Sequence, residues 1–223
     1  MQLRVRDVAR ILKVSEKTVY QWVKTGGLAA QHVSGQLRFN RTELLEWATS
    51  RNFSVSPELF SEEDADAAPM PGLAEALETG GTFHDVDGVD KESVLRAVVE
   101  RMQLPAEVDR QFLFSVLLAR EALGSTAVGD GIAIPHVRNP IVLHVKQPTI
   151  TLCFLKTPID FGALDHKPVH ALFSMVSPSI RVHLHLLARL GFALKDARFK
   201  KLVHRKAPAA EILAAVRAME SAL

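Results

Sequence analysis

The chain has 223 residues, a formal net charge of +2, 48% hydrophobic and 23% charged residues, a balance typical of a globular protein with one large or two modest domains. The longest apolar runs are too short to cross a bilayer and the N-terminus has no apolar signal region, so we expect a cytoplasmic protein without membrane insertion. The single Cys153 excludes an internal disulfide and suits a reducing compartment.

The charge is unevenly distributed along the chain. Residues 1–53 hold nine basic and four acidic residues, and residues 54–79 hold seven acidic residues and no basic one. The remainder, 80–223, holds eighteen basic and fourteen acidic residues. Such blocks have different roles, so we predict a basic head (1–53), an acidic linker (54–79) and a larger body (80–223).

The head has the pattern of a helix-turn-helix followed by a hairpin. The first helix has an apolar face, and Ser15 is a natural cap for a second helix over 16–24. Gly26-Gly27 ends that helix, and residues 28–39 read as a hairpin with Ser-Gly at its tip. A third helix is predicted over 41–51. The apolar face of the first helix comprises Val5, Val8, Ala9, Ile11 and Leu12.

These pieces resemble the MerR/excisionase-like winged helix, a DNA-binding domain. The resemblance covers about residues 3–51 and implies that the second helix enters the major groove while the wing arginine contacts the backbone or minor groove. One such head binds weakly, so a dimer is the expected working form. The alternative is that these polar faces are merely solvated. The residues expected at the DNA are Lys17, Thr18, Tyr20, Gln21, Lys24 and Arg38.

The linker contains prolines, small residues and acids, which bury little apolar surface. Within it, Leu73, Ala76 and Leu77 are spaced for a short helical turn that docks on a partner or on the body. The body then alternates helices and strands. Helices are predicted over 91–102, 107–123, 181–194, 197–204 and 208–219, and strands over 132–134, 149–155 and 169–175.

One segment of the body, residues 120–136, carries groups suited to phosphoryl transfer. A helix ends near Gly124, a turn rich in hydroxyls and glycines follows, and a short apolar strand ends at Pro135-His136. A nucleophilic imidazole at His136, the hydroxyls of Ser125 and Thr126 and the guanidinium of Arg120 are the groups that a transferring phosphoryl group needs.

This segment resembles the active-site signature of IIA domains of the bacterial phosphotransferase system, of the mannitol/fructose and nitrogen-regulatory type. Two further motifs, over 159–176 and 183–190, follow in the family's order. The resemblance implies an α/β fold, with a mixed sheet flanked by helices on both faces. It also implies that His136 accepts a phosphoryl group from the histidine phosphocarrier protein, and that Arg120, Ser125 and His183 stabilise that group. No cofactor is implied.

Other interpretations remain open for the body. His183 and His185 point to different sides of a helix, so they do not chelate one metal ion, and no metal site is predicted. The leading hypothesis is a phosphotransferase-linked transcription regulator. The first alternative is a sugar-transport or nitrogen-regulation component whose head does not bind DNA. The second is a structural domain that binds its partner without phosphoryl transfer.

Overall fold

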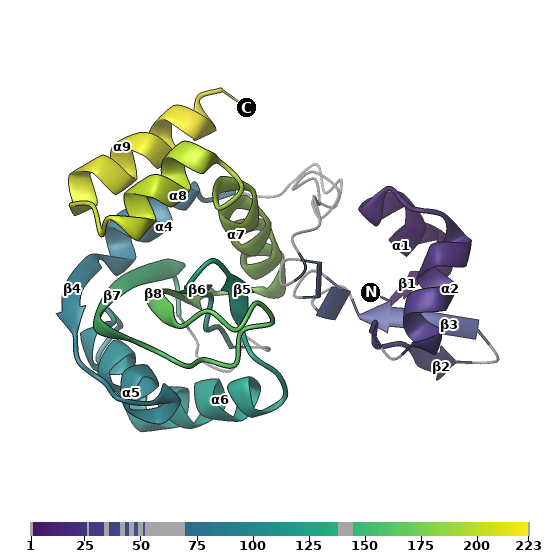
Figure 1. The fold of residues 1–223 in the computed structure, drawn as a ribbon, viewed down its shortest axis with the longest axis horizontal. Helices are drawn as coiled ribbons and strands as arrows, with labels where there is room; N and C mark the ends of the chain where they lie inside the picture. Colours follow the sequence, from purple (N-terminus) through teal and green to yellow (C-terminus); the bar gives the residue numbers. More distant parts are fainter. Residues whose placement is uncertain are drawn as a thin grey trace.

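The computed structural model describes residues 2–25, 27–33, 36–40, 43–44, 47–48, 51, 70–137 and 145–222 (Figure 1). They form a small head and a larger body, each with its own sheet. Within these ranges, every helix is too short or too polar to pass through a lipid bilayer.

The head contains two helices and a three-stranded antiparallel sheet with the strand order β1-β3-β2. The predicted helix-turn-helix and hairpin are confirmed, whereas the first strand was not foreseen. Of the predicted third helix over 41–51, Glu43, Leu44, Trp47 and Ala48 are helical, and six of its other positions lie outside the described residues. The elements of the head are β1 (Gln2–Arg4), α1 (Val5–Leu12), α2 (Glu16–Lys24), β2 (Gln31–Val33) and β3 (Gln36–Asn40).

The turn between α1 and α2 fixes the angle at which the two helices meet. Lys13 adopts the left-handed conformation (φ 53°), and the backbone N–H of Val14 donates to the carbonyl of Ala9 (2.9 Å). Ser15 begins α2, since its hydroxyl accepts a hydrogen bond from the backbone N–H of Thr18 (3.1 Å). The chain therefore turns sharply, and apolar side chains from both helices are buried together.

The body begins earlier than the sequence predicted. Residues assigned to the end of the linker form α4 (Leu73–Gly80), whose apolar side chains are buried in the core of the body. Its first backbone N–H groups, those of Leu73 and Ala74, donate to the carboxylate of Glu220. At its last residue a Cβ would lie 2.3 Å from the carbonyl oxygen of Ile150, so only glycine fits there. The linker therefore ends before Leu73. The apolar spacing of these residues suggested only a short helical turn, and burial against the body stabilises the full helix.

The body is organised around a five-stranded mixed sheet with the order β4-β7-β8-β6-β5. The central pair, β7 and β8, is antiparallel, as is the pair β5 and β6. The pairs β4–β7 and β6–β8 are parallel. The strands are β4 (Thr82–Val86), β5 (Ala127–Gly129), β6 (Ile132–Ala133), β7 (Thr149–Ile159) and β8 (Val169–Val176).

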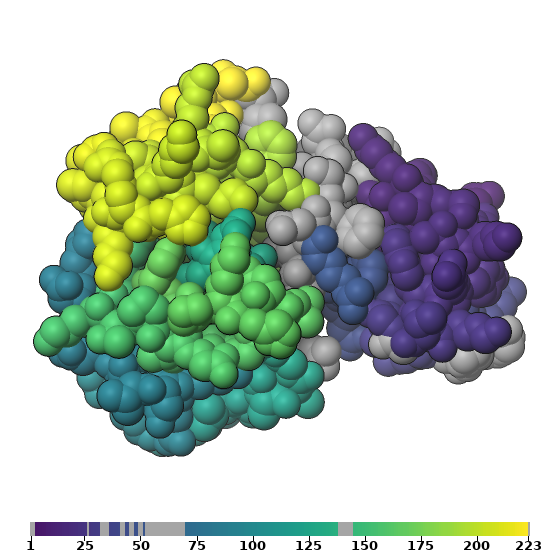
Figure 2. Space-filling model, viewed as in Figure 1, coloured from purple at the N-terminus to yellow at the C-terminus, as the bar shows by residue number. Residues whose placement is uncertain are grey.

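Helices cover both faces of this sheet, as predicted (Figure 1). Along β7 the side chains alternate: Leu152 and Phe154 pack on one face with α4, α7, α8 and α9, and Cys153 packs on the other with α5 and α6. In Figure 2 the C-terminal part of the chain (yellow) and the residues of α5 and α6 (blue to teal) lie on opposite sides of the body. The helices are α5 (Lys91–Arg101), α6 (Arg110–Ala122), α7 (Ile180–Ala193), α8 (Ala197–His204) and α9 (Ala209–Glu220).

Candidate functional site

The candidate site lies where two parallel strands end. β6 pairs with β8 through Ile132 and Ala171, and the pairing continues beyond β6 as a bridge between His136 and Met175. The backbone N–H of Met175 donates to the carbonyl of Pro135 (3.0 Å). The carboxyl ends of neighbouring parallel strands are where α/β sheets usually bind their ligands. His136 therefore occupies the position in this sheet where a functional group is expected.

The imidazole of His136 is held in one tautomer. Its Nδ1 lies 2.8 Å from the carbonyl oxygen of Ile134. Because a carbonyl oxygen only accepts hydrogen bonds, Nδ1 carries the proton and Nε2 carries the lone pair. The residue is 3% exposed. The nitrogen suited to nucleophilic attack is thus Nε2.

His183 comes to the same place from the first turn of α7. Ser179 caps this helix by accepting a hydrogen bond from the backbone N–H of Val182 (3.2 Å). The centroids of the His136 and His183 rings lie 5.2 Å apart, with the planes tilted by 46°. The N-terminus of a helix carries a partial positive charge that attracts anions. The structure therefore brings both predicted histidines together beside a helix end that favours an anionic group.

The hydroxyl-bearing turn adjoins the segment of His136 through the β5–β6 hairpin. The backbone N–H of Ile134 donates to the carbonyl of Thr126 (3.0 Å), which places the Ser125–Thr126 turn beside the chain that leads to His136. The hydroxyl of Ser125 donates to the carbonyl of Phe161 (2.6 Å) and accepts from the N–H of Ala127 (3.2 Å). Ser125 thus joins two loops, and its own proton is engaged with Phe161.

Arg120 lies in the last turn of α6, directly before this loop. Its Nη1 donates to the carbonyl of Gly124 (3.0 Å), so the guanidinium closes the turn through which α6 leads to Ser125. The side chain is partly buried. The structure therefore places Arg120 and Ser125 on the same short connection, whereas His136 and His183 form a direct ring contact.

Sequence reasoning assigned no role to Glu121, which organises this connection. Its buried carboxylate accepts hydrogen bonds from the backbone N–H (3.1 Å) and the hydroxyl (2.6 Å) of Thr126, and it pairs with Lys91 (3.1 Å). A negative charge is unfavourable in the last turn of a helix, so a carboxylate at that position of an apolar helix indicates a specific partner. This acidic residue in the last turn of an apolar helix is the sequence feature from which the role of Glu121 could have been predicted.

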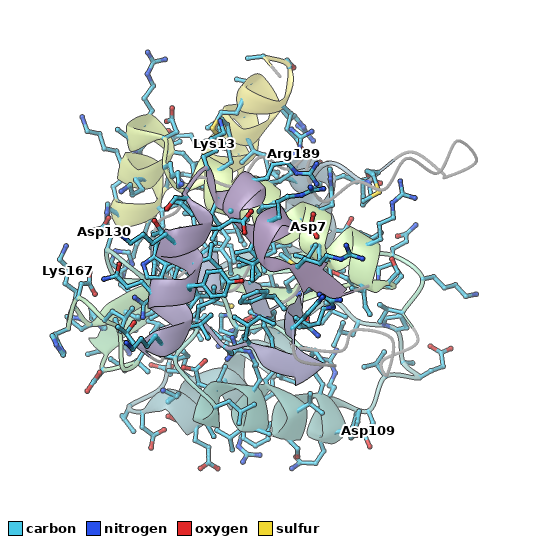
Figure 3. All side chains as sticks on the ribbon, turned by 90° about the vertical axis from the view of Figure 1, so that its right-hand side faces the viewer. Asp7, Lys13, Asp109, Asp130, Lys167 and Arg189 are labelled. Atoms are coloured by element: carbon cyan, nitrogen blue, oxygen red, sulfur yellow. The ribbon has the colours of Figure 1, made fainter. Side chains whose placement is uncertain are left out.

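Ion pairs stabilise the turn between β5 and β6. Gly129, Asp130 and Gly131 all have positive φ angles (89°, 52° and 72°), which glycine adopts freely and aspartate tolerates. Hydrogen bonds from Lys167 and Lys200 to the carboxylate of Asp130, 2.9 Å each, lower its pKa to about 2. Figure 3 shows Asp130 and Lys167 next to each other at the surface of the body. These ion pairs fix the hairpin whose second strand leads to His136.

The predicted DNA-contacting residues are mostly at the surface of the head. On α2, Lys17, Gln21 and Lys24 are exposed, and 52% of Tyr20 is exposed. By contrast, the hydroxyl of Thr18 lies 2.8 Å from that of Ser15, so it takes part in the helix cap. Arg38 lies on β3, the strand that follows the tip of the hairpin, and is partly buried.

Comparison with known proteins agrees with this architecture. The family model described as "Phosphoenolpyruvate-dependent sugar phosphotransferase system, EIIA 2" matches residues 75–219, and a helix-turn-helix domain model matches residues 3–52. The chain is 38% identical over 148 residues to a nitrogen regulatory protein of Pseudomonas aeruginosa, an alignment covering 65% of this chain and 93% of that protein. The corresponding protein of Escherichia coli is 32% identical over 126 residues, covering 56% of this chain and 76% of that protein.

Solved structures give the same assignment. The crystal structure of the nitrogen regulatory protein IIA-Ntr from Neisseria meningitidis superposes with a TM-score of 0.57 and 27% identity, covering 65% of this chain and 98% of that one. The mannitol IIA domain of Escherichia coli, at 20% identity and a TM-score of 0.50, shares the fold. This chain therefore belongs to the EIIA type 2 family of the phosphoenolpyruvate-dependent sugar phosphotransferase system, of the nitrogen-regulatory kind, with a helix-turn-helix domain preceding the EIIA domain.

Proposed function

We propose that this chain is a cytoplasmic, phosphotransferase-linked transcription regulator. In this proposal His136 accepts a phosphoryl group from the phosphohistidine of a histidine phosphocarrier protein, and the MerR-like head binds DNA. The observation that carries the proposal is the pairing of His136 with His183 at the N-terminus of α7, with the Nδ1 proton of His136 held by Ile134. That arrangement supplies a nucleophile of defined tautomer and a positively polarised surrounding for the transferred anion.

The transfer step follows from this geometry. The lone pair on Nε2 of His136 attacks the phosphorus, and the bond between phosphorus and the donor's nitrogen breaks as the new P–N bond forms. Because the transition state is loose, the protein contributes mainly positioning and charge stabilisation. The ring of His183 contacts the acceptor ring and is the stabilising group supplied by α7. In the proposal, Arg120 and Ser125 complete the site from the loop before β5.

The head supports the second half of the proposal. Lys17 and Lys24 are exposed on α2, where they are suited to contacts with phosphates, while Gln21 between them is suited to a base edge. Tyr20 and Thr18 lie on the same helix, and Arg38 lies on β3, the second strand of the hairpin. Two heads in a dimer would span two half-sites and supply the affinity that one small domain lacks.

Two measurements test the proposal. First, the protein is incubated with phosphoenolpyruvate and the general phosphotransferase proteins, and its intact mass is compared with that of His136→Gln. We expect one acid-labile phosphoryl group on the wild type and none on the variant. Acquisition of no label by the wild type would refute the phosphotransfer role.

Second, DNA binding by the head is tested by gel-shift titration at several salt concentrations, with DNA fragments selected for binding to the protein. Replacing both lysines of α2 (Lys17→Ala, Lys24→Ala) should lower the affinity and reduce the slope of log K against log salt by roughly 2, about 0.9 for each phosphate that is no longer neutralised. The matched control is Lys156→Ala with Lys201→Ala, two exposed lysines of the body. Equal slopes for the two double variants would show that α2 does not face DNA.

A further inference from the structure

Helix α7 presents a second polar face, distinct from the one that carries His183. Arg181, His185 and Arg189 recur at every fourth residue, so their side chains form one stripe along the helix. All three are partly buried, whereas Leu184, Leu187 and other residues of the opposite side are fully buried in the body. We call these three residues the α7 stripe; Arg189 is labelled in Figure 3.

Two donors of the stripe have no acceptor among the described residues. The Nε atoms of Arg181 and Arg189 are shielded from solvent, and neither has a hydrogen-bond partner in that part of the chain. Burial and the nearby Arg189 lower the pKa of His185, and Glu220 only partly opposes this shift. The carboxylate of Glu220 is already engaged, because it accepts hydrogen bonds from the backbone N–H groups of Leu73 and Ala74. A shielded donor without an acceptor is unfavourable. The two guanidinium charges make the stripe a cationic surface suited to carboxylates.

The chain itself enters the body on this stripe. Burial lowers the pKa of His185, which lies between the two arginines, and the nearby backbone of Pro71 opposes that shift. Immediately afterwards, Glu220 holds the first residue of α4 through the backbone N–H of Leu73 (2.5 Å). The described part of the body therefore begins next to the α7 stripe, near Pro71.

Those preceding residues have the complementary charge. Residues 52–69, which lie outside the described part of the chain, contain no lysine or arginine. Their acids include a dense group within 62–66. An extended chain advances roughly 3.3 Å per residue, so Asp66 lies within about 16 Å of Pro71 and Glu62 within about 30 Å. The stripe spans about 12 Å from Arg181 to Arg189, at 1.5 Å per residue. Both arginines are thus within reach of these acids.

We propose that the α7 stripe is an intramolecular docking site for the acidic segment Glu62–Asp66 of the same chain. Binding within one chain needs little intrinsic affinity, because the short connection to Pro71 gives the segment a millimolar effective concentration. The segment connects the head to the body, and α7 carries His183 in its first turn. A docked segment would therefore place the connection to the head on the helix that adjoins the acceptor histidine. The docking itself does not depend on phosphoryl transfer.

The test measures the position of the segment directly. A nitroxide is attached to Ala65→Cys in the full-length protein, and paramagnetic broadening of the backbone amides is recorded at low salt. The native Cys153 does not interfere, because burial raises the pKa of its thiol to about 12 and only a thiolate reacts readily. We expect selective broadening along the exposed side of α7, near Arg181 and Arg189.

Two kinds of variant separate charge pairing from other causes. Arg181→Gln with Arg189→Gln should lower the ratio of docked to free segment by about tenfold, since an exposed ion pair contributes a factor of about 2–5. The second variant, Glu62→Gln, Glu63→Gln, Asp64→Asn and Asp66→Asn, should do the same without touching the folded body. The matched control is Arg198→Gln with Lys201→Gln, two exposed cations of α8, which should leave the broadening unchanged.

Three results would overturn the proposal. In the first, the amides of α7 are not broadened. In the second, spin-labelled protein at natural isotope abundance is mixed with isotope-labelled protein that carries no nitroxide. If the α7 amides of the isotope-labelled protein are broadened as much as in the first experiment, the occupant of the stripe is a second copy of the chain. In the third, the control pair lowers the broadening as much as the arginine pair, which would reduce the effect to net charge.

Discussion

The imidazole rings of His136 and His183 lie 5.2 Å apart, although one follows β6 and the other lies in the first turn of α7. Both are almost closed off from solvent, at 3% and 1% exposure. In such surroundings a fixed hydrogen-bond donor or helix end contributes more to charge stabilisation than it does in water. This relationship leads to the first two predictions.

The phosphoryl group should be attached to Nε2 of His136. The carbonyl of Ile134 occupies Nδ1, at 2.8 Å, so only Nε2 offers a lone pair for attack. The nitrogen is identified by long-range ¹H–¹⁵N correlation of the phosphorylated protein, in which phosphorus couples to one ring nitrogen. Coupling to Nδ1 would contradict the tautomer assigned here.

Replacing His183 by alanine should slow phosphoryl acceptance by about 10²–10³-fold while leaving His136 able to react. The reason is the loss of one preorganised donor from the site, the magnitude being that of removing one oxyanion-hole donor. Quench-flow measurement of the labelled fraction gives the rate. His84→Ala, an exposed histidine of β4, is the control and should react at the wild-type rate. An unchanged rate for His183→Ala would remove that ring from the mechanism.

Glu121→Ala should lower the free energy of unfolding by about 3 kcal/mol. The change leaves two polar groups of Thr126 without their acceptor and removes the partner of Lys91 from a buried position. Urea denaturation followed by circular dichroism measures the loss. The matched control is Glu92→Ala, whose exposed pairing with Arg96 should contribute less than about 0.5 kcal/mol. Similar losses for both variants would show that Glu121 does not organise the loop.

Asp130→Asn should destabilise the protein at neutral pH and not at acid pH. The two lysines lower the pKa of Asp130 in the folded protein to about 2, below its value of about 3.9 in an unfolded chain. The resulting stabilisation is complete above about pH 4 and disappears as the pH falls towards 2. Because the side chain is 38% exposed, screening reduces it to about 1 kcal/mol. Asparagine also tolerates the positive φ angle, so the comparison isolates the charge.

Urea midpoints at pH 7, 4 and 2.5 test this prediction. The difference between wild type and Asp130→Asn should shrink steadily over that range. Asp87→Asn, at an exposed ion pair with Lys156 (3.6 Å), should differ from wild type by less than about 0.5 kcal/mol throughout. A constant difference for Asp130→Asn would assign its effect to shape rather than to charge.

Phosphorylation of His136 should weaken docking of the acidic segment on the α7 stripe. A phosphoryl group adds roughly −1.5 to −2 charge near the helix end that carries Arg181, which attracts this arginine and repels the carboxylates. The nitroxide-induced broadening of α7 amides should therefore decrease in the phosphorylated protein. Undiminished broadening in the phosphorylated sample would show that phosphorylation of His136 does not affect docking on the stripe. It would contradict neither the docking nor the phosphoryl transfer by itself.

Local patterns explain why much of the fold was predictable. Ser15 and the apolar faces around it define α1 and α2 within a few residues, and the run over 149–155 was recognisable as a strand, although β7 extends to Ile159. By contrast, α4 and β4 are short, and β4 is partly exposed, so neither has a long periodic pattern. Their stability comes from packing against β7, α9 and other distant elements, which no local window contains.

The sequence by itself determined the chemical identity of the candidate site, because the order of residues around Ser125 and His136 is a local property of one loop and one strand end. Only the tertiary structure decided which groups meet. The strand order places β6 beside β8, and this brings His136 to the start of α7, where His183 lies. Likewise, Glu121 meets Lys91 and Thr126 through the packing of α5 against α6 and the loop that follows. Contacts between distant residues depend on how whole elements pack, since burial of their combined apolar surfaces, and not the affinity of any one pair, fixes their arrangement.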